Sequence, residues 1–276
     1  MVSCYGVESL GELVFVGLGL HDAMGISLRG LEEAREADAV FIELYTSLMP
    51  ELSVLELEKL VGRGVLIVSR RDLEEEGGRM ILEEAKEGKA VLLVPGDPLI
   101  ATTHADLRVR AEKQGINTRL IHGASIVSAV VGLCGLQNYK FGRSVTIPFS
   151  EEGFASETPY RVILENRVMG LHTLCFLDIR AEESRCMTVR EGLQALLGVE
   201  RRKRGHVITL DTLVVGIARA GSRDPVVKAG YVGEIMSYDF GSPPHTLVFP
   251  GRLHFMEAEA LITLAGAPES IRERVE

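Results

Sequence analysis

The sequence lacks the features of a membrane or secreted protein. No stretch approaches the roughly 18 to 20 continuous apolar residues that a membrane helix needs. Residues 1–20 carry no Lys or Arg, and Glu8 and Glu12 interrupt them, so we expect no secretory signal. The four cysteines show no CxxC pair, which predicts buried free thiols and no disulfide framework. These absences favour a soluble, cytoplasmic protein.

An excess of positive charge is also missing. The formal net charge is −9, so the surface would repel phosphates over most of its area. This excludes nonspecific binding to nucleic acid or to an anionic membrane as the main function. The one basic run, Arg201–Arg204, is expected to be a solvated loop or helix end.

Several catalytic motifs are absent. The seven histidines lack HExxH spacing, and no GxSxG segment occurs, so we predict neither a metal site nor a serine nucleophile elbow. His104 is expected to have a surface or capping role, and His172 to be a satisfied histidine at a strand edge. There is no internal repeat and no low-complexity tract.

The first half of the chain alternates apolar strands with helical segments. Strands that are apolar throughout are buried on both faces, which predicts a parallel sheet covered by helices. Ser27 is expected to cap the first helix. The predicted strands are 13–16, 39–42, 65–68, 90–94 and 118–121, and the predicted helices follow Ser27 or lie near 51–62, 72–88, 103–114 and after Ser125.

The pattern changes after about residue 140. Residues 138–158 contain glycines and prolines and few long apolar runs, so they are interpreted as a connector. Helices near 159–169, 188–199 and 255–264 then mix with strands near 173–177, 213–218, 226–232 and 246–249. We therefore predict an α/β protein with an N-terminal domain at 1–143 and a mixed α/β domain at 144–276.

The glycine turn Gly17-Leu18-Gly19 follows the first strand and invites a dinucleotide-binding interpretation, in which Glu43 could bind a ribose. That fingerprint needs a third glycine where Asp22 stands. The next helix also begins only around Ser27, too late to hold a pyrophosphate at its N-terminus. A tight turn that lets a ligand approach the backbone is the better interpretation.

Two further segments follow strands in the same way. Pro95-Gly96-Asp97-Pro98 comes after the most apolar strand, and His122-Gly123-Ala124-Ser125 leads into a helix. Ligands of open α/β sheets bind beyond the carboxyl ends of strands, so the loops at 17–22 and 95–100 indicate a site more strongly if their strands are neighbours. A plain turn at Asp97 and a simple helix cap at Ser125 are the structural alternatives.

Taken together, these segments resemble the diphthine synthase family, a branch of the tetrapyrrole-methylase-like (class III) methyltransferases. Tetrapyrrole methylases share the fold but usually carry a proline where Leu20 stands. A corrin or sirohaem methylase is therefore only the second candidate within the fold. The segments that carry the resemblance are FVGLGL (15–20), FIELYTSLM (41–49), VPGDPLIATTHADLRVRA (94–111), IHGASIVSAV (121–130), YKFG (139–142), GLHTLCFLDI (170–179), IARAGS (217–222) and DFGSPPHTLVFPGRLHFMEAEAL (239–261).

The resemblance implies two α/β domains of the tetrapyrrole methylase type, with S-adenosylmethionine (SAM) in the cleft between them, and a homodimer. It implies trimethylation of the amino group of 3-amino-3-carboxypropyl-histidine on elongation factor 2, giving diphthine and S-adenosylhomocysteine. It names no catalytic base. The implied SAM-binding residues are Leu20, Asp97, Ile100, Ser125, Ile126, Leu177, Ala220 and His245.

Two other classes of function remain as alternatives. A nicotinamide-dependent oxidoreductase would bind NAD(P)H and have no affinity for SAM, and the missing third glycine counts against it. A non-enzymatic scaffold would bind neither, and would leave the three loops at 17–22, 95–100 and 122–126 without a shared ligand.

Overall fold

The computed structural model describes residues 11–150, 155–183 and 185–275. Cys4 and the N-terminal extension lie outside the described residues. The chain forms two compact units, residues 1–125 and residues 126–276. The sequence placed the domain boundary later, after residue 143. Helix α5 (Ile126–Cys134) lies in the second unit, where Gly135 packs against Ala260 and Leu264.

The first unit is built on a parallel five-stranded sheet, as predicted. Its strand order is β3-β2-β4-β1-β5, and every pair of neighbours is parallel. The two central strands, β4 and β1, are buried on both faces, which explains their continuous apolar sequence. The strands are β1 (Glu12–Gly17), β2 (Ala39–Glu43), β3 (Leu66–Val68), β4 (Lys89–Val94) and β5 (Asn117–Ile121).

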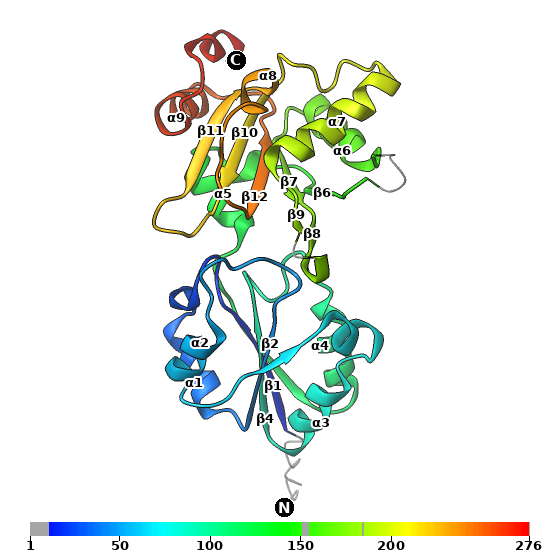
Figure 1. Ribbon diagram of the computed structural model, residues 1–276, viewed down its shortest axis with the longest axis vertical. Coiled ribbons are helices and arrows are strands. Elements are labelled where there is room, and N and C mark those ends of the chain that lie inside the picture. The colour runs from blue at the N-terminus through cyan, green and yellow to red at the C-terminus, as the bar shows by residue number, and fades with distance from the viewer. Residues whose placement is uncertain (1–10, 151–154, 184, 276) are drawn as a thin grey trace, which may run out of the picture. The chain divides into compact units, whose positions relative to one another are not determined.

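Helices cover both faces of this sheet (Figure 1). One face carries α1 (Leu28–Glu36) and α2 (Val54–Val61), and the other carries α3 (Arg79–Glu87) and α4 (His104–Lys113). The predicted cap of α1 is confirmed, because Ser27 Oγ accepts from the Gly30 amide at 3.0 Å.

The helix predicted over 72–88 is interrupted. A short π-helical turn covers Arg71–Glu75, and α3 begins only at Arg79. Gly77 and Gly78 lie between them with φ values of 66° and 70°, a left-handed conformation that ends the first turn. The charged pattern alone does not contain this break.

The second unit contains helices and one five-stranded mixed sheet in the order β11-β10-β12-β7-β6. Only β6 and β7 run parallel, and the other neighbours are antiparallel. Its strands are β6 (Val145–Ile147), β7 (Thr173–Leu177), β10 (Leu213–Ala218), β11 (Val226–Tyr231) and β12 (His245–Phe249), with a hairpin of β8 (Ile179–Arg180) and β9 (Arg185–Cys186). Its helices are α5 (Ile126–Cys134), α6 (Thr158–Val168), α7 (Val189–Lys203), α8 (Val232–Ile235) and α9 (Phe255–Ala265).

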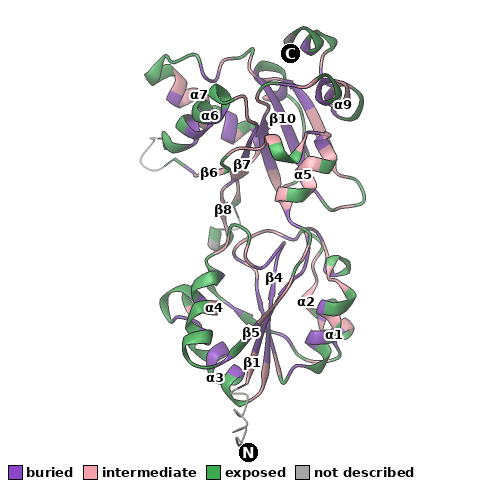
Figure 2. Cartoon of the chain, turned by 180° about the vertical axis from the view of Figure 1, so that it is seen from behind, coloured by how far each residue is buried: buried purple, intermediate pink, exposed green. Residues whose placement is uncertain are grey.

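Figure 2 shows the central strands of each unit buried and the outer helix faces exposed. Strand β6 falls inside the predicted connector, whose polar flanks hide a short strand. Cys134 and Cys175 are buried free thiols, which confirms the prediction for these two residues. The basic run lies at the exposed end of α7, again as predicted. Among the described helices, none is both long and apolar enough to span a membrane.

Candidate functional site

The loops after β1 and β4 lie against each other. Strand β1 pairs directly with β4, so the glycine turn and the Pro95-Gly96-Asp97 segment leave the sheet side by side. The Gly19 amide donates to Gly96 O at 3.2 Å, and the Gly96 amide donates to Gly19 O at 2.6 Å. The condition set by the sequence, that the strands be neighbours, is therefore confirmed.

Three glycines let the backbones of these loops approach one another. Strand β5 pairs with the other side of β1, which brings Gly123 to the same place. A Cβ atom on Gly123 would lie 2.4 Å from Gly96 O, and one on Gly17 would lie 2.5 Å from the Gly123 amide nitrogen. No other residue fits at Gly17 or Gly123 without a backbone shift, so packing requires these two glycines, while Gly96 meets no atom within 4 Å and has a φ of 72° that favours glycine.

Asp97 is the charged group at the centre of this edge. Its side chain is buried, and it accepts from the Leu99 amide at 3.1 Å. The second carboxylate oxygen lies 2.7 Å from His122 Nδ1, which joins the loops after β4 and β5. Of the other predicted residues of this unit, Leu20 is half-buried, Ile100 is exposed and Ser125 is buried.

Three of the four predicted residues of the second unit lie at one edge of its sheet. Leu177 ends β7 and His245 begins β12, and these strands are antiparallel neighbours. Ala220 follows the end of β10, whose last residue, Ala218, pairs with His245. Ile126 is the first residue of α5. The register therefore brings Leu177, Ala220 and His245 together.

The His245 ring is held in one neutral tautomer. Nδ1 accepts from the Val189 amide at 3.3 Å, so the ring proton is on Nε2, which donates to Gly241 O at 3.1 Å. Burial lowers the pKa of His245. The ring is thus a fixed, uncharged wall and not a proton carrier.

A buried polar cluster lies on the same edge of the first sheet as Asp97. Glu43, the last residue of β2, is inaccessible to solvent, and its Oε1 lies 3.3 Å from Nε2 of the buried His104. The surface or capping role expected for His104 is therefore wrong. Glu43 also accepts from the amides of Tyr45 and Thr46, both at 3.0 Å, and from the Thr46 hydroxyl. Its carboxylate faces inward, unlike a ribose ligand.

One feature of the sequence indicates the buried cluster of Glu43 and His104. A glutamate that ends an otherwise apolar strand, as in AVFIE, must find polar partners inside the protein. Its histidine partner is 61 residues away in the sequence, so periodicity could not identify it.

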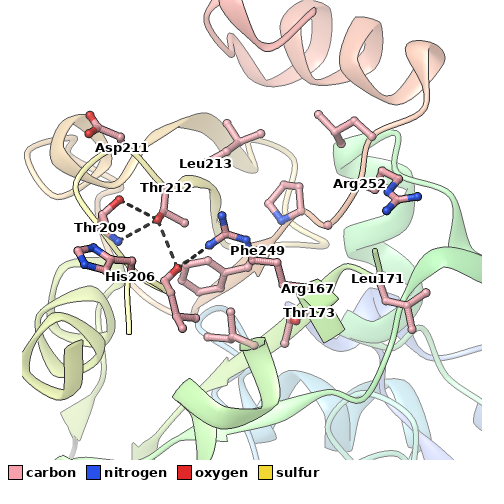
Figure 3. Close-up of a pocket in the computed structure, with 15 residues that line it drawn as sticks. Arg167, Leu171, Thr173, His206, Thr209, Asp211, Thr212, Leu213, Phe249 and Arg252 are labelled. Carbon is pink, nitrogen blue, oxygen red and sulfur yellow. Dashed lines mark hydrogen bonds between the residues drawn. The ribbon is translucent and has the colours of Figure 1, made fainter. Parts of the chain in front are cut away.

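A cavity of about 480 Å³ lies at the opposite edge of the second sheet. Figure 3 shows Arg167 reaching into it, where Nη1 donates to Val207 O at 3.0 Å. Thr173 at the start of β7 and Phe249 at the end of β12 also line it. None of the predicted cofactor-binding residues lines this cavity. Within the described ranges, no group of three His, Cys, Asp or Glu side chains is arranged to hold a metal ion.

A parallel α/β unit with glycine loops at its carboxyl edge, followed by a mixed-sheet unit, is the architecture that the resemblance implied for a class III methyltransferase. The family model of the tetrapyrrole (corrin/porphyrin) methylases matches residues 12–235. The chain belongs to this family and is a methyltransferase.

Individual relatives indicate which branch of this family the chain is similar to. A diphthine synthase of Methanosarcina mazei is 51% identical over 269 residues, which cover 96% of this chain and all of the relative. A diphthine synthase of Methanothermobacter thermautotrophicus is 45% identical and covers 95% of this chain and 99% of its own. A crystal structure of diphthine synthase superposes with a TM-score of 0.86 at 44% identity, covering 95% of this chain and 99% of the other.

Proposed function

We propose that this protein methylates the amino group of 3-amino-3-carboxypropyl-histidine on elongation factor 2, giving diphthine in diphthamide biosynthesis. The observation that supports this most strongly is 51% identity to a diphthine synthase along the whole length of that relative. A similarity of this extent includes both units and every loop described above. The reaction would take place in the cytoplasm, and the resemblance further implies a homodimer.

We propose SAM as the methyl donor, and the first unit offers a suitable cradle for it. At Gly96, whose φ is +72°, a Cβ atom would meet no heavy atom within 4 Å, so a ligand can approach the backbone of this loop. Asp97 provides a buried carboxylate, which can accept from a hydroxyl or an ammonium group, and Ser125 provides a hydroxyl. Leu20 and Ile100 can supply apolar walls.

The second unit supplies mainly apolar contacts in this proposal. Ile126, Leu177 and Ala220 carry no polar side-chain atoms, and His245 is held neutral. Apolar walls with a few fixed polar groups are what a cofactor with both a flat base and a charged end requires.

Bound SAM supplies an already activated methyl group, so the protein's task is to orient the reactants. Asp97 would hold the donor in place through its buried carboxylate. The acceptor amine must be neutral to attack, and its proton can leave to water, so no side chain is assigned as a general base. The second carboxylate contact, to His122, fixes the orientation of Asp97.

Intact-mass spectrometry tests this function directly. Elongation factor 2 carrying the 3-amino-3-carboxypropyl-histidine is incubated with the protein and SAM, and mass steps of one, two and three methyl groups are expected. No mass shift with SAM binding retained would indicate a small-molecule methylase of the same fold. No SAM binding at all would contradict the proposed donor.

Site-directed variants test the SAM residues separately. Asp97→Asn is expected to weaken SAM binding about 10- to 100-fold in calorimetry, because a charge-assisted hydrogen bond is lost. Asp106→Asn is the matched control, since Asp106 is exposed and pairs with Arg110 on α4. Equal SAM affinity of the two variants would remove Asp97 from the proposed site.

A further inference from the structure

Two side chains lie next to each other beyond the ends of β2 and β3. Glu43 and Val68 are paired last residues of these parallel strands, and Tyr45 and Arg70 each come two residues later. The guanidinium carbon of Arg70 lies over the Tyr45 ring, 5.2 Å from its centroid. Because β2 also pairs with β4, both side chains share the carboxyl edge that carries Asp97.

The Tyr45 ring is a rigid support for Arg70. Its amide is fixed by the Glu43 carboxylate at 3.0 Å, and its ring meets His104 edge-on, with centroids 6.3 Å apart. His104 is itself 3.3 Å from Glu43 and begins α4, directly after the loop that carries Asp97. One buried glutamate therefore anchors both the support of Arg70 and the end of the proposed cofactor loop.

The Arg70 guanidinium remains accessible to an anionic ligand. Within the described residues its ion pair is a long one, 3.9 Å from Nε to Glu74 Oε2, and its side chain is 54% exposed. Glu74 is also engaged by the Thr103 hydroxyl at 3.1 Å. Burial and the Glu43 charge raise the pKa of Tyr45 to about 12, so the ring under Arg70 stays uncharged at neutral pH. Stacking on a ring leaves the N–H edge of a guanidinium free to donate.

We propose that Arg70, held over the Tyr45 ring, binds the carboxylate of the amino-acid-like acceptor. This inference rests on the proposed function, whose acceptor carries a carboxylate and an amine on the same carbon. Arginine pairs with a carboxylate through two parallel hydrogen bonds, which fix orientation as well as position. Fixing the carboxylate therefore also directs the amine, and the residue acts in acceptor binding and not in SAM binding.

Steady-state kinetics on the full-length protein, with modified elongation factor 2 as the varied substrate and saturating SAM, tests the assignment. Arg70→Met is expected to raise the KM for the factor about 10- to 100-fold, the loss of a charge-assisted interaction. Arg70→Lys should recover part of this, because it keeps the charge but not the planar fork. The dissociation constant of SAM should stay within about twofold in both variants, since the expected loss is confined to the acceptor.

Arg71→Met is the matched control, because the neighbouring Arg71 pairs with Glu76 at 3.2 Å. It should leave the KM unchanged. An Arg70→Met variant with the KM of the control would overturn the inference, and so would an equal loss of SAM affinity, which would indicate a structural role. Absence of methyl transfer by the unsubstituted protein would instead overturn the proposed function, and this inference with it.

Discussion

A buried glutamate–histidine pair lies in each unit, and the two pairs differ in their surroundings. Glu43 and His104 lie in the first unit, and Glu257 and His172 in the second. All four side chains are almost inaccessible to solvent. The carboxylate-to-ring distances are similar, 3.3 Å in the first pair and 2.9 Å in the second.

The second pair is completed by a cation. Lys140 also donates to the Glu257 carboxylate, and the Gln137 and His254 amides do so at 2.8 and 2.9 Å. The other ring nitrogen of His172 accepts from the Gly251 amide at 2.9 Å. Every partner comes from the protein itself, and the network joins the segment after α5 to β7 and α9. Such a closed network is explained by folding alone.

The first pair has no lysine or arginine bonded to its carboxylate within the part of the chain that the structure describes. Next to it, the buried hydroxyl of Tyr45 makes no hydrogen bond of good geometry among the described residues, although the Thr103 side chain is near enough to lower its pKa. A buried polar group without a partner calls for an explanation, and the proposed function gives one, because ligands of open α/β sheets bind at this edge. The comparison therefore separates a pair whose polar groups are all matched within the protein from one that, in the proposed function, supports a site.

The largest expected effect is a loss of stability when the network around Glu257 and His172 is broken. Glu257→Gln should destabilise the protein by about 3 to 5 kcal/mol, because Lys140 would lose its buried counter-charge. Urea unfolding measures this loss. Glu259→Gln on the same helix is the control: its partner Arg272 and Glu259 itself are about half-exposed, so a change below about 0.5 kcal/mol is expected. Equal losses would mean that the network contributes no special stability.

Low pH should weaken the same network by protonating the Glu257 carboxylate. Burial alone would raise the pKa of Glu257, but hydrogen bonds from His172, the His254 amide and Lys140 lower it to about 2. In the unfolded chain the pKa is near 4.5, so this stabilisation is complete above about pH 4.5 and is lost as the pH falls toward 2. The stability difference between the unsubstituted protein and Glu257→Gln should shrink in that window by up to about 3 kcal/mol. A difference that stays constant would contradict this assignment.

A smaller loss of stability is expected when the Glu43–His104 pair is changed. Glu43→Gln should cost about 1 to 3 kcal/mol, since the new amide group faces the donors of Tyr45 and Thr46. Unlike Glu257→Gln, it should also raise the KM for modified elongation factor 2 at a temperature where both variants are folded. An unchanged KM for Glu43→Gln would mean that the Glu43–His104 pair, like the Glu257–His172 pair, has only a structural role.

The smallest effect is expected for Tyr45→Phe. The hydroxyl makes no hydrogen bond of good geometry, so its removal should change stability by less than about 0.5 kcal/mol or increase it slightly. The ring under Arg70 remains, and the KM should therefore be preserved. A large increase in KM measured by the same assay would show that the hydroxyl itself contacts the acceptor.

Much of the architecture could be predicted because it depends on local patterns. Continuous apolar strands such as Val91–Val94 can only be buried on both faces, which gives the parallel sheet. Short elements in polar segments were missed, among them β6 and the hairpin of β8 and β9, because their pairing partners supply most of their stability. The break at Gly77 and Gly78 was missed although a glycine pair is a turn signal, because the charged residues on both sides were assigned to one helix.

The candidate site was predictable in part for the same reason. The loops at Gly19, Gly96 and Gly123 are visible as glycines after strands, and the resemblance supplied the residues of the second unit. The Glu43–His104 pair and the stacking of Arg70 on Tyr45 were not predicted. Each joins segments from different strands, and no spacing along the chain encodes which loops meet.

The sequence by itself determined the class of fold, the glycine loops and the family, since apolar periodicity and motifs are properties of contiguous residues. Only the tertiary structure decided which strands are neighbours, and so which loops share an edge. It also decided that His104 is buried and that Glu257 is neutralised by Lys140 while Glu43 is not. The physical reason is that burial and charge pairing depend on distances in space, which are set by packing of the whole unit and not by separation along the chain.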